Sequence, residues 1–488
     1  MEKLRACAIA QTCPLCRKDL PPGLEQLYLE EYRIYSDLTK YLLPLQKGFS
    51  DKNILPKNQQ SLMNKAIENW TIAANQGYAK AQKSLAKLYL IGIGVEPDYL
   101  KAAELFEKAA VQGITSAQRC LATMYVEGRG IKQNYSEALR WYEKAAESGD
   151  ASAQSSLSTM YYEGQGIEQN YLKAYHWVKL AADAGCSRAQ SNLASLYREG
   201  LGVKKDSKEA YKWYELSAKQ GDDLGKFNMG RMYLFGEGVS KNVKKAISWF
   251  QKAEKHQNVS AMFSLGTMYY NGNDGMNVNY SLAVHYYNKA AMLGDGSSQF
   301  ELAKMYYRGT GEIKKSPQTT LKYLKMSPCV DKPEAQAMIG NIYFDTPNFK
   351  KNYKLALYWS TKAAKENEPI AMYVLGNMSM DGLGTVTKSL EDAIQWYQKA
   401  VQFGGQQDAA VNLGALHAQG HGVEQSFTKA MYYYKIAADK GDQDSMIRIG
   451  DMHLRGEGVV RNKLEAKKWY EKALRCGSPV ASTRLLLV

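Results

Sequence analysis

The stretch RAQSNLASLYREGLGVKKDSKEAYKWYELSAKQG, residues 188–221, contains the pattern that decides the fold. Its first half has the spacing of one face of an amphipathic helix: Ala189, Leu193 and Tyr197. Gly200 and Gly202 interrupt this helix, because glycine adopts the left-handed backbone that a tight turn needs. A second apolar helical face follows: Ala210, Trp213, Tyr214 and Ala218. Gly221 then closes the unit in the position of a left-handed helix end. The stretch predicts two helices joined by a Gly-x-Gly turn.

The residue that closes this unit recurs along the chain every 36 or 37 residues. The equivalent positions are Gly77, Gly113, Gly149, Gly185, Gly221, Gln257, Gly294, Asp331, Asn367, Gly404, Gly441 and Gly477. One pair of helices cannot bury its own apolar face, so such units must stack on one another. The sequence therefore predicts an all-α solenoid of about eleven 36–37-residue repeats.

Small and aromatic residues also keep fixed places in the repeat. The position of Ala86 in the first helix becomes Gly in several later units, which indicates close helix packing. All eight tryptophans lie in the second helix of a unit, and seven of them follow its small residue by three positions, as Trp141 follows Ala138. We expect these side chains to wedge between neighbouring helix pairs. Replacement of Trp213 by Ala should then cost about 3–5 kcal/mol.

The unit resembles the Sel-one-like repeat, a relative of the tetratricopeptide repeat. The resemblance rests on the pattern Ala-x-x-x-Leu-Gly-x-x-Tyr-x-x-Gly-x-Gly-Val followed by Lys-Ala-x-x-Trp-Tyr-x-Lys-Ala-Ala-x-x-Gly, which residues 188–221 follow nearly letter for letter. It covers residues 60–488, as eleven full hairpins with a leading half and a trailing half. The resemblance implies a right-handed αα-superhelix that binds proteins or peptides along its concave face.

Units six to nine depart from the pattern. The sixth has one extra residue in its turn, and the eighth carries Thr346-Pro347-Asn348 where the two turn glycines belong. The seventh ends in Ser327-Pro328-Cys329. Because small rotations between repeats set the curvature of a solenoid, we expect a kink near residues 310–350. Sequence drift and a functional hinge both explain it.

Residues 1–23 do not carry the repeat. Cys13-Pro14-Leu15-Cys16-Arg17 resembles the closing stretch of a RING-type zinc finger, which implies Cys13 and Cys16 as zinc ligands, with Cys7 as a further candidate. Structural zinc requires four ligands, and this segment offers three cysteines and no histidine. Two interpretations stay open: a RING-type finger whose upstream half is missing, or a cysteine pair that holds no metal. Residues 24–59 are expected to form one amphipathic helix followed by a linker.

The cysteines and the apolar residues bear on the compartment. Cys120, Cys186, Cys329 and Cys476 occupy non-equivalent positions of different units, which is not the pattern of a disulfide framework. The sequence shows no signal peptide and no apolar run long enough for a membrane helix. These features predict a cytoplasmic protein, with the nucleus as an alternative.

The sequence offers no evident catalytic site. The Gly-x-Gly turns lack the preceding strand and the third glycine of a dinucleotide-binding fingerprint. His417 and His453 take the place of Tyr197 in successive units, and His421 lies in a turn. A metal or acid–base role for these histidines competes with simple aromatic packing, which we favour. We predict a protein that is not an enzyme and needs no cofactor, apart from zinc if the amino-terminal cysteines bind it.

The net charge of +14 suggests an electrostatic role. Basic residues gather between the turn and the second helix of several units, and five of them are candidates for partner binding: Lys204, Lys205, Lys241, Lys314 and Lys315. A fixed position in each repeat becomes one edge of the solenoid, so we expect a basic stripe that guides an acidic protein or an anionic membrane surface. The competing interpretation is a solvated row of turns. Nucleic-acid binding is disfavoured, because no polar code recurs at fixed positions.

Two functions from different classes follow. The first is a non-catalytic scaffold or adaptor that binds protein partners. The alternative is the substrate-binding part of a RING-type ubiquitin ligase, which the amino-terminal resemblance alone implies.

Overall fold

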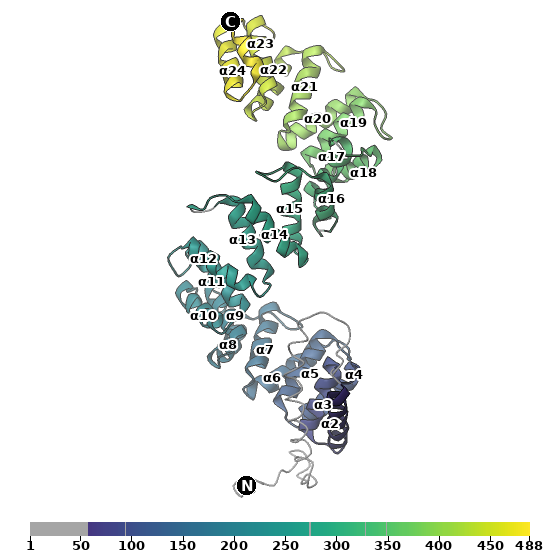
Figure 1. The fold of residues 1–488 in the computed structure, drawn as a ribbon, viewed down its shortest axis with the longest axis vertical. Coiled ribbons are helices and arrows are strands. Elements are labelled where there is room, and N and C mark those ends of the chain that lie inside the picture. Colours follow the sequence, from purple (N-terminus) through teal and green to yellow (C-terminus); the bar gives the residue numbers. More distant parts are fainter. Residues whose placement is uncertain (1–56, 93, 273–274, 327, 348) are drawn as a thin grey trace. The chain divides into compact units, whose positions relative to one another are not determined.

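The computed structural model describes residues 57–92, 94–272, 275–326, 328–347 and 349–488 (Figure 1). All regular secondary structure within these ranges is helical, which confirms the all-α prediction. The chain divides into two compact units, of which unit 1 ends at His256 and unit 2 comprises Gln257–Val488. No described helix has both the length and the apolar character that crossing a membrane requires.

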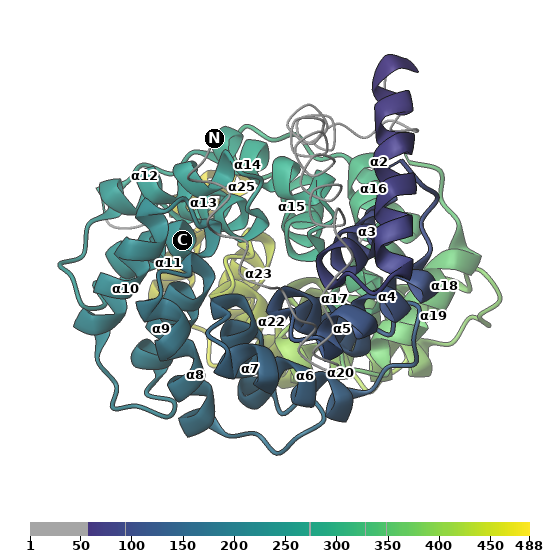
Figure 2. The ribbon, with the colours of Figure 1, turned by 90° about the horizontal axis from the view of Figure 1, so that it is seen from below.

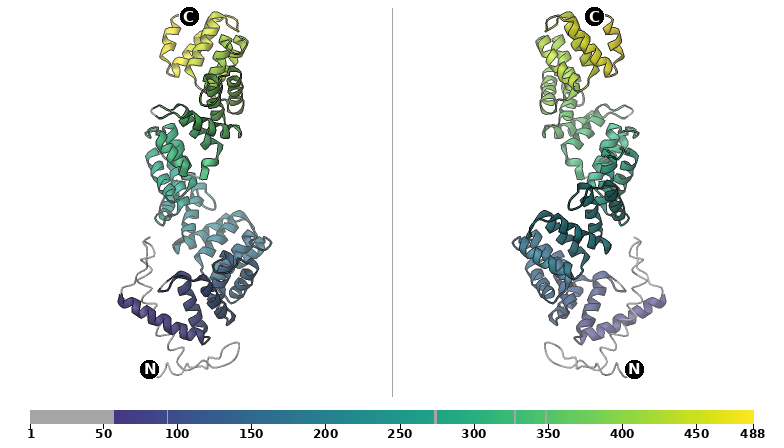
Figure 3. Two further views of the ribbon diagram at one scale, coloured as in Figure 1. Left: turned by 90° about the vertical axis from the view of Figure 1, so that its right-hand side faces the viewer. Right: turned by 90° about the vertical axis from the view of Figure 1, so that its left-hand side faces the viewer.

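The described part of unit 1 begins with a long helix that is followed by five helix pairs (Figures 1 and 3). These helices are α2 (Lys57–Asn75), α3 (Ala79–Ile91), α4 (Tyr99–Val111), α5 (Thr115–Glu127), α6 (Tyr135–Glu147), α7 (Ala151–Glu163), α8 (Tyr171–Asp183), α9 (Ser187–Glu199), α10 (Ser207–Lys219), α11 (Asp223–Phe235) and α12 (Val243–Glu254).

Unit 2 continues with six further pairs and a short last helix. Its elements are α13 (Val259–Asn271), α14 (Tyr280–Met292), α15 (Gly296–Arg308), α16 (Pro317–Met326), the 3₁₀ helix η4 (Pro328–Asp331), α17 (Pro333–Asp345), α18 (Tyr353–Ala364), α19 (Pro369–Asp381), α20 (Leu390–Gly404), α21 (Gln407–Gln419), α22 (Phe427–Asp439), α23 (Gln443–Arg455), α24 (Lys463–Arg475) and α25 (Pro479–Leu485). The two units together hold eleven pairs, with α2 and α25 as unpaired halves, as the period predicts.

The helices of a unit form two layers. Within unit 1, Figure 2 shows α9 and α11 on the inner side of the row, with α8, α10 and α12 on the outer side. The first helices α9 and α11 of two successive pairs are thus in contact. We call the exposed surface of these first helices the A-face.

The same backbone hydrogen bond recurs in the turn of each described pair, and the turn between α9 and α10 illustrates it. Gly200 ends α9 with φ 76°, in the left-handed region that the sequence predicts for it. The backbone N–H of Asp206 donates to the carbonyl of Tyr197 over 2.8 Å. The Asp206 carboxylate accepts hydrogen bonds from the backbone of Lys208 and Glu209, which caps the first turn of α10.

Except in the pair of α15 and α16, the second helix of each described pair ends on another left-handed residue. At the end of α10, the N–H of Gly221 donates to the carbonyl of Ala218, and that of Asp222 donates to the carbonyl of Ser217. This pair of bonds is a Schellman motif, which requires a positive φ at Gly221. Gln257 and Asn367 hold the same conformation without being glycine, each with φ 63°. The equivalent end of α20 lies one residue later than the period predicts, at Gly405 rather than Gly404.

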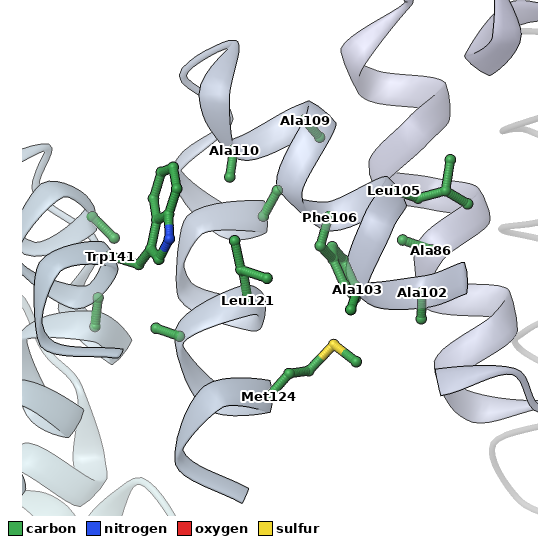
Figure 4. Packing of buried hydrophobic residues seen from close by; sticks show 14 of the residues in the cluster. Ala86, Ala102, Ala103, Leu105, Phe106, Ala109, Ala110, Leu121, Met124 and Trp141 are labelled. Carbon is green, nitrogen blue, oxygen red and sulfur yellow. The ribbon is translucent and has the colours of Figure 1, made fainter. Parts of the chain in front are cut away.

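The core lies between the two layers and between successive pairs. Figure 4 shows Leu121 and Met124 of α5 directed toward Phe106 of α4. All three side chains are fully buried, and the small side chain of Ala86 on α3 leaves room for this packing. In later repeats glycine takes that place, and a Cβ added to Gly266 would come within 2.6 Å of the Tyr287 ring.

Trp70 and Trp141 are buried in the core, as expected for wedges between pairs, whereas the other tryptophans differ from that expectation. Trp213 is only half-buried, and its ring lies 5.1 Å from the ammonium group of Lys179 on the preceding pair. The next residue, Tyr214, is fully buried and fills the space between the helices. Because Trp213 keeps one face at the surface, its replacement by Ala should cost about 2 kcal/mol rather than the value for full burial.

The departures from the repeat have local counterparts. Helix α16 is shorter than its equivalents, and η4 follows it where other repeats complete the second helix. Helix α17 ends at Thr346 in an extended conformation instead of a left-handed one. These features fall within residues 310–350, whereas the division into compact units lies at residues 256 and 257.

Candidate protein-interaction surfaces

The metal and acid–base sites that the sequence suggests involve cysteines of the amino-terminal segment and histidines of unit 2. Cys7, Cys13 and Cys16 lie outside the described residues, so zinc binding there stays a prediction. Within the described residues, no group of His, Cys, Asp and Glu side chains is arranged to hold a metal ion. His417 is buried and stacks on the ring of Tyr433 at 5.6 Å, as the packing interpretation predicts. Burial lowers the pKa of His417 and of His453.

The predicted lysines of unit 1 lie in two adjacent turns. Lys204 and Lys205 lie between α9 and α10, Lys241 lies between α11 and α12, and all three are exposed. The turns are adjacent because Gly238 packs on the first residue of α10: a Cβ added there would come within 2.1 Å of the Ser207 carbonyl oxygen. We call Lys204, Lys205 and Lys241 the basic edge of unit 1.

The remaining predicted lysines belong to unit 2. Lys314 and Lys315 are exposed in the turn between α15 and α16. The same contact orders this turn, because Gly311 packs on the Tyr280 side chain at the start of α14. A stripe that runs along the whole chain stays a prediction, and Glu168 interrupts it in unit 1 at the position equivalent to Lys204.

The A-face of unit 1 contains a pocket that the sequence did not indicate. Its volume is about 220 Å³, and residues of α7 and α9 line it: Ser158, Thr159, Tyr162, Glu163, Asn192, Ser195, Leu196 and Glu199. The Tyr162 hydroxyl donates to Glu199 over 3.5 Å, and the Arg198 guanidinium donates to the same carboxylate over 2.7 Å. Burial and the neighbouring Glu199 raise the pKa of Tyr162. The pocket is polar and acidic, in contrast to the basic edge.

Hydroxyl groups connect the two layers beneath the A-face. The Tyr214 hydroxyl lies 2.7 Å from Ser195 Oγ, and the equivalent Tyr287 hydroxyl lies 3.0 Å from Thr267 Oγ1. Tyr470 donates to the buried carboxylate of Asp451 over 2.7 Å. The repeat places a hydroxyl, amide or carboxyl group four residues before the end of the first helix in these units, and this recurrence in the sequence could have revealed the bonds.

A second pocket lies in unit 2, beside the turn that follows α17. The sequence does not predict this pocket, because the loss of the turn glycines by itself indicates only sequence drift or a hinge. Lys315 alone among its lining residues was predicted as a binding residue.

Comparison with known proteins agrees with this architecture. The model of the Sel1 repeat family matches twelve segments: residues 56–78, 79–114, 115–150, 151–186, 187–222, 224–258, 259–295, 296–327, 333–368, 369–402, 407–442 and 443–478. The first segment is the leading half, and the other eleven correspond to the helix pairs.

Two solved structures of repeat proteins are similar to this chain. A protective antigen of uropathogenic Escherichia coli that displays an SLR fold is 28% identical, with a TM-score of 0.57, over 96% of this chain and 93% of its own. A Sel1 repeat protein from Oxalobacter formigenes is 31% identical over 47% of this chain and 94% of its own, with a TM-score of 0.43.

An uncharacterised protein of Neisseria meningitidis serogroup B is 27% identical over 89 residues. That match spans 18% of this chain and only 19% of the relative's length. The repeats matched by the family model, their helix pairs and the shared SLR fold together establish the family. The chain belongs to the Sel1 repeat family.

Proposed function

We propose that this protein is a non-catalytic scaffold that binds protein partners through the exposed surfaces of its repeats. Sel1 repeat proteins generally mediate protein–protein interactions. The observation that carries the proposal is the basic edge of unit 1, where Gly238 holds two lysine-bearing turns against each other. Adjacent turns lie within about one Debye length, roughly 10 Å, so their charges act together on an approaching acidic surface.

The partner is expected to be an acidic protein, because charge complementarity accelerates association and gives it a strong dependence on salt. Lys314 and Lys315 extend the same chemistry to unit 2. The free thiols of Cys120, Cys186 and Cys476 support a reducing compartment such as the cytoplasm.

The experiment combines partner capture with charge reversal. Crosslinking and affinity purification of the full chain identify a partner, which is then purified for association kinetics over a salt series. Replacement of Lys204, Lys205 and Lys241 by Glu should slow association at low salt and reduce the salt dependence of its rate. Dichroism and melting should stay unchanged, because these side chains are exposed.

The matched control reverses Lys65, Lys80 and Lys108, which are exposed helix residues away from the edge. It changes the net charge by the same amount. If the edge variant and the native chain associate at the same rate, with the same dependence on salt, the basic edge does not guide the partner and its lysines only make the turns soluble. An equal loss in the control would show that net charge, and not the edge, guides the partner.

The ubiquitin-ligase alternative depends on Cys13 and Cys16, outside the described residues. Zinc bound in proportion to the chain, lost when both cysteines become Ser, would favour it. If the chain binds its partner without bound zinc, the result favours the scaffold function over the ubiquitin-ligase alternative.

A further inference from the structure

The turn after α17 lacks the glycine contact that most of the other described turns make with the preceding second helix. In the preceding repeat, Gly309 ends α15 in the left-handed region, and Gly311 packs on the start of the previous second helix. After α17, Thr346 stands in the place of the first glycine, with φ −107° and ψ 127°. Asn348 stands in the sequence position of the second. The chain therefore leaves α17 in a different direction.

A pocket of about 370 Å³ lies where this turn and the start of α16 face each other. Its walls come from α15, α16 and α17 and the turns beside them: Tyr306, Tyr307, Arg308, Lys315, Ser316, Pro317, Thr320, Asn341, Ile342, Asp345, Thr346 and Pro347. Both Lys315 and Arg308 belong to the segment that leads out of α15 toward α16.

The charges that line this pocket favour an anion. Arg308 is 60% exposed and lies 3.7 Å from the exposed Glu334, a separation at which an ion pair contributes little. The only carboxylate among the lining residues, Asp345, is paired with Lys351 over 2.6 Å. Arg308 and Lys315 thus present two positive charges that no lining carboxylate neutralises.

Neutral groups of the pocket suit an extended side chain. The Tyr307 hydroxyl accepts a hydrogen bond from Asn341 Nδ2 over 2.5 Å, so its own proton is available for a further acceptor. The rings of Tyr306, Pro317 and Pro347 line the remaining walls and offer apolar surface for a methylene stem. A cationic head and apolar walls together match a carboxylate carried on a short aliphatic chain.

We propose that this pocket binds a glutamate or aspartate side chain of an acidic segment in a protein partner. The proposal rests on the scaffold function and specifies one anchoring site for it. Arg308 and Lys315 hold the carboxylate, and the Tyr307 hydroxyl donates to it. The loss of the two glycines is then the change that created a binding site from a structural turn.

The test uses the full chain and a fluorescein-labelled oligo-glutamate peptide, with binding followed by fluorescence anisotropy at low and at physiological salt. Replacement of Arg308 and Lys315 by Gln should weaken binding at least about tenfold, which corresponds to roughly 1.4 kcal/mol. The control replaces Lys325 and Lys354 by Gln, because these lysines of α16 and α18 are exposed and do not line the pocket. It removes the same charge and should change the affinity less than about twofold.

Two peptide results would overturn the proposal: no binding to the native chain, or an equal loss in the control, which would indicate a diffuse electrostatic field. The purified partner separates this proposal from the scaffold function. A partner that binds the Arg308 and Lys315 variant as tightly as the native chain refutes the pocket and leaves the scaffold intact. A chain that captures no partner under crosslinking refutes the scaffold function, whatever the peptide shows.

Discussion

Two neighbouring aromatic residues of α10, Trp213 and Tyr214, have different roles in packing. Tyr214 is fully buried and bonds across the layers to Ser195, whereas Trp213 covers the surface of the packed pair under the ammonium group of Lys179. Composition cannot distinguish the two, because both are large aromatic residues on the same side of one helix. Trp70 shows the consequence: it takes the place of Tyr214 in its helix and is fully buried.

The buried tyrosines make a testable contribution to stability at alkaline pH. Burial raises the pKa of Tyr287 to about 12, from an ordinary value of 10.0. The folded chain holds this proton more tightly than the unfolded chain. The contribution is therefore complete below pH 10 and lost as the pH rises from 10 to 12, by about 3 kcal/mol in all.

Urea unfolding of the native chain and of Tyr287→Phe over this pH range measures the effect. The Phe variant loses the bond to Thr267, which costs about 1 kcal/mol at every pH below the window. Its deficit relative to the native chain should shrink and then reverse above pH 10. A constant difference up to pH 12 would contradict the raised pKa.

The turn between the helices of a pair is the element that joins successive repeats. In the turn between α9 and α10, the second glycine, Gly202, has a positive φ and also lies against Tyr171 at the start of α8, so two independent constraints act on one residue. The closing glycine of the repeat has only the first constraint. Gly202 and Gly221 therefore form a natural comparison between backbone conformation and packing.

We expect Gly202→Ala to destabilise the chain far more than Gly221→Ala. Both substitutions place an L-residue at positive φ, which costs about 1–2 kcal/mol. A Cβ at residue 202 would also lie 2.0 Å from the Tyr171 carbonyl oxygen, which adds about 1–3 kcal/mol, whereas one at residue 221 meets nothing within 4 Å. Thermal unfolding followed by circular dichroism measures the midpoints of the two variants. Equal midpoints would show that the contact of Gly202 with α8 does not contribute to stability.

The sequence predicted the elements that repeat and missed those that do not. The spacing from Gly77 to Gly477 gave the eleven pairs, and the glycine pairs gave the left-handed turns. Gln257 and Asn367 adopt the same backbone without being glycine; asparagine visits the left-handed region more readily than most residues, whereas the residue type of Gln257 does not indicate it. The pocket beside Thr346 was not predictable, because a missing glycine indicates only which contact is lost and not where the chain goes instead.

At the scale of the whole chain, each repeat depends on its neighbours alone. In such an architecture stability is nearly a sum of repeat and interface terms, so a local lesion should stay local. Trp213→Ala should raise amide hydrogen exchange in α8–α11 and leave α21–α24 unchanged. Native-state exchange read by mass spectrometry tests this, with Lys208→Ala on the exposed side of α10 as the control. Faster exchange throughout the chain would indicate one cooperative core.

The contact between the second turn glycine and the second helix of the preceding repeat also limits how such a chain can change in length. Gly202, Gly238 and Gly458 all meet the first residues of the second helix one repeat earlier, so these three junctions are made from the same two surfaces. Duplication or deletion of a whole repeat recreates that junction without any compensating substitution. Duplication of half a repeat would place a turn opposite the wrong helix. We therefore expect related chains to differ in length by whole repeats, because only whole repeats recreate this junction.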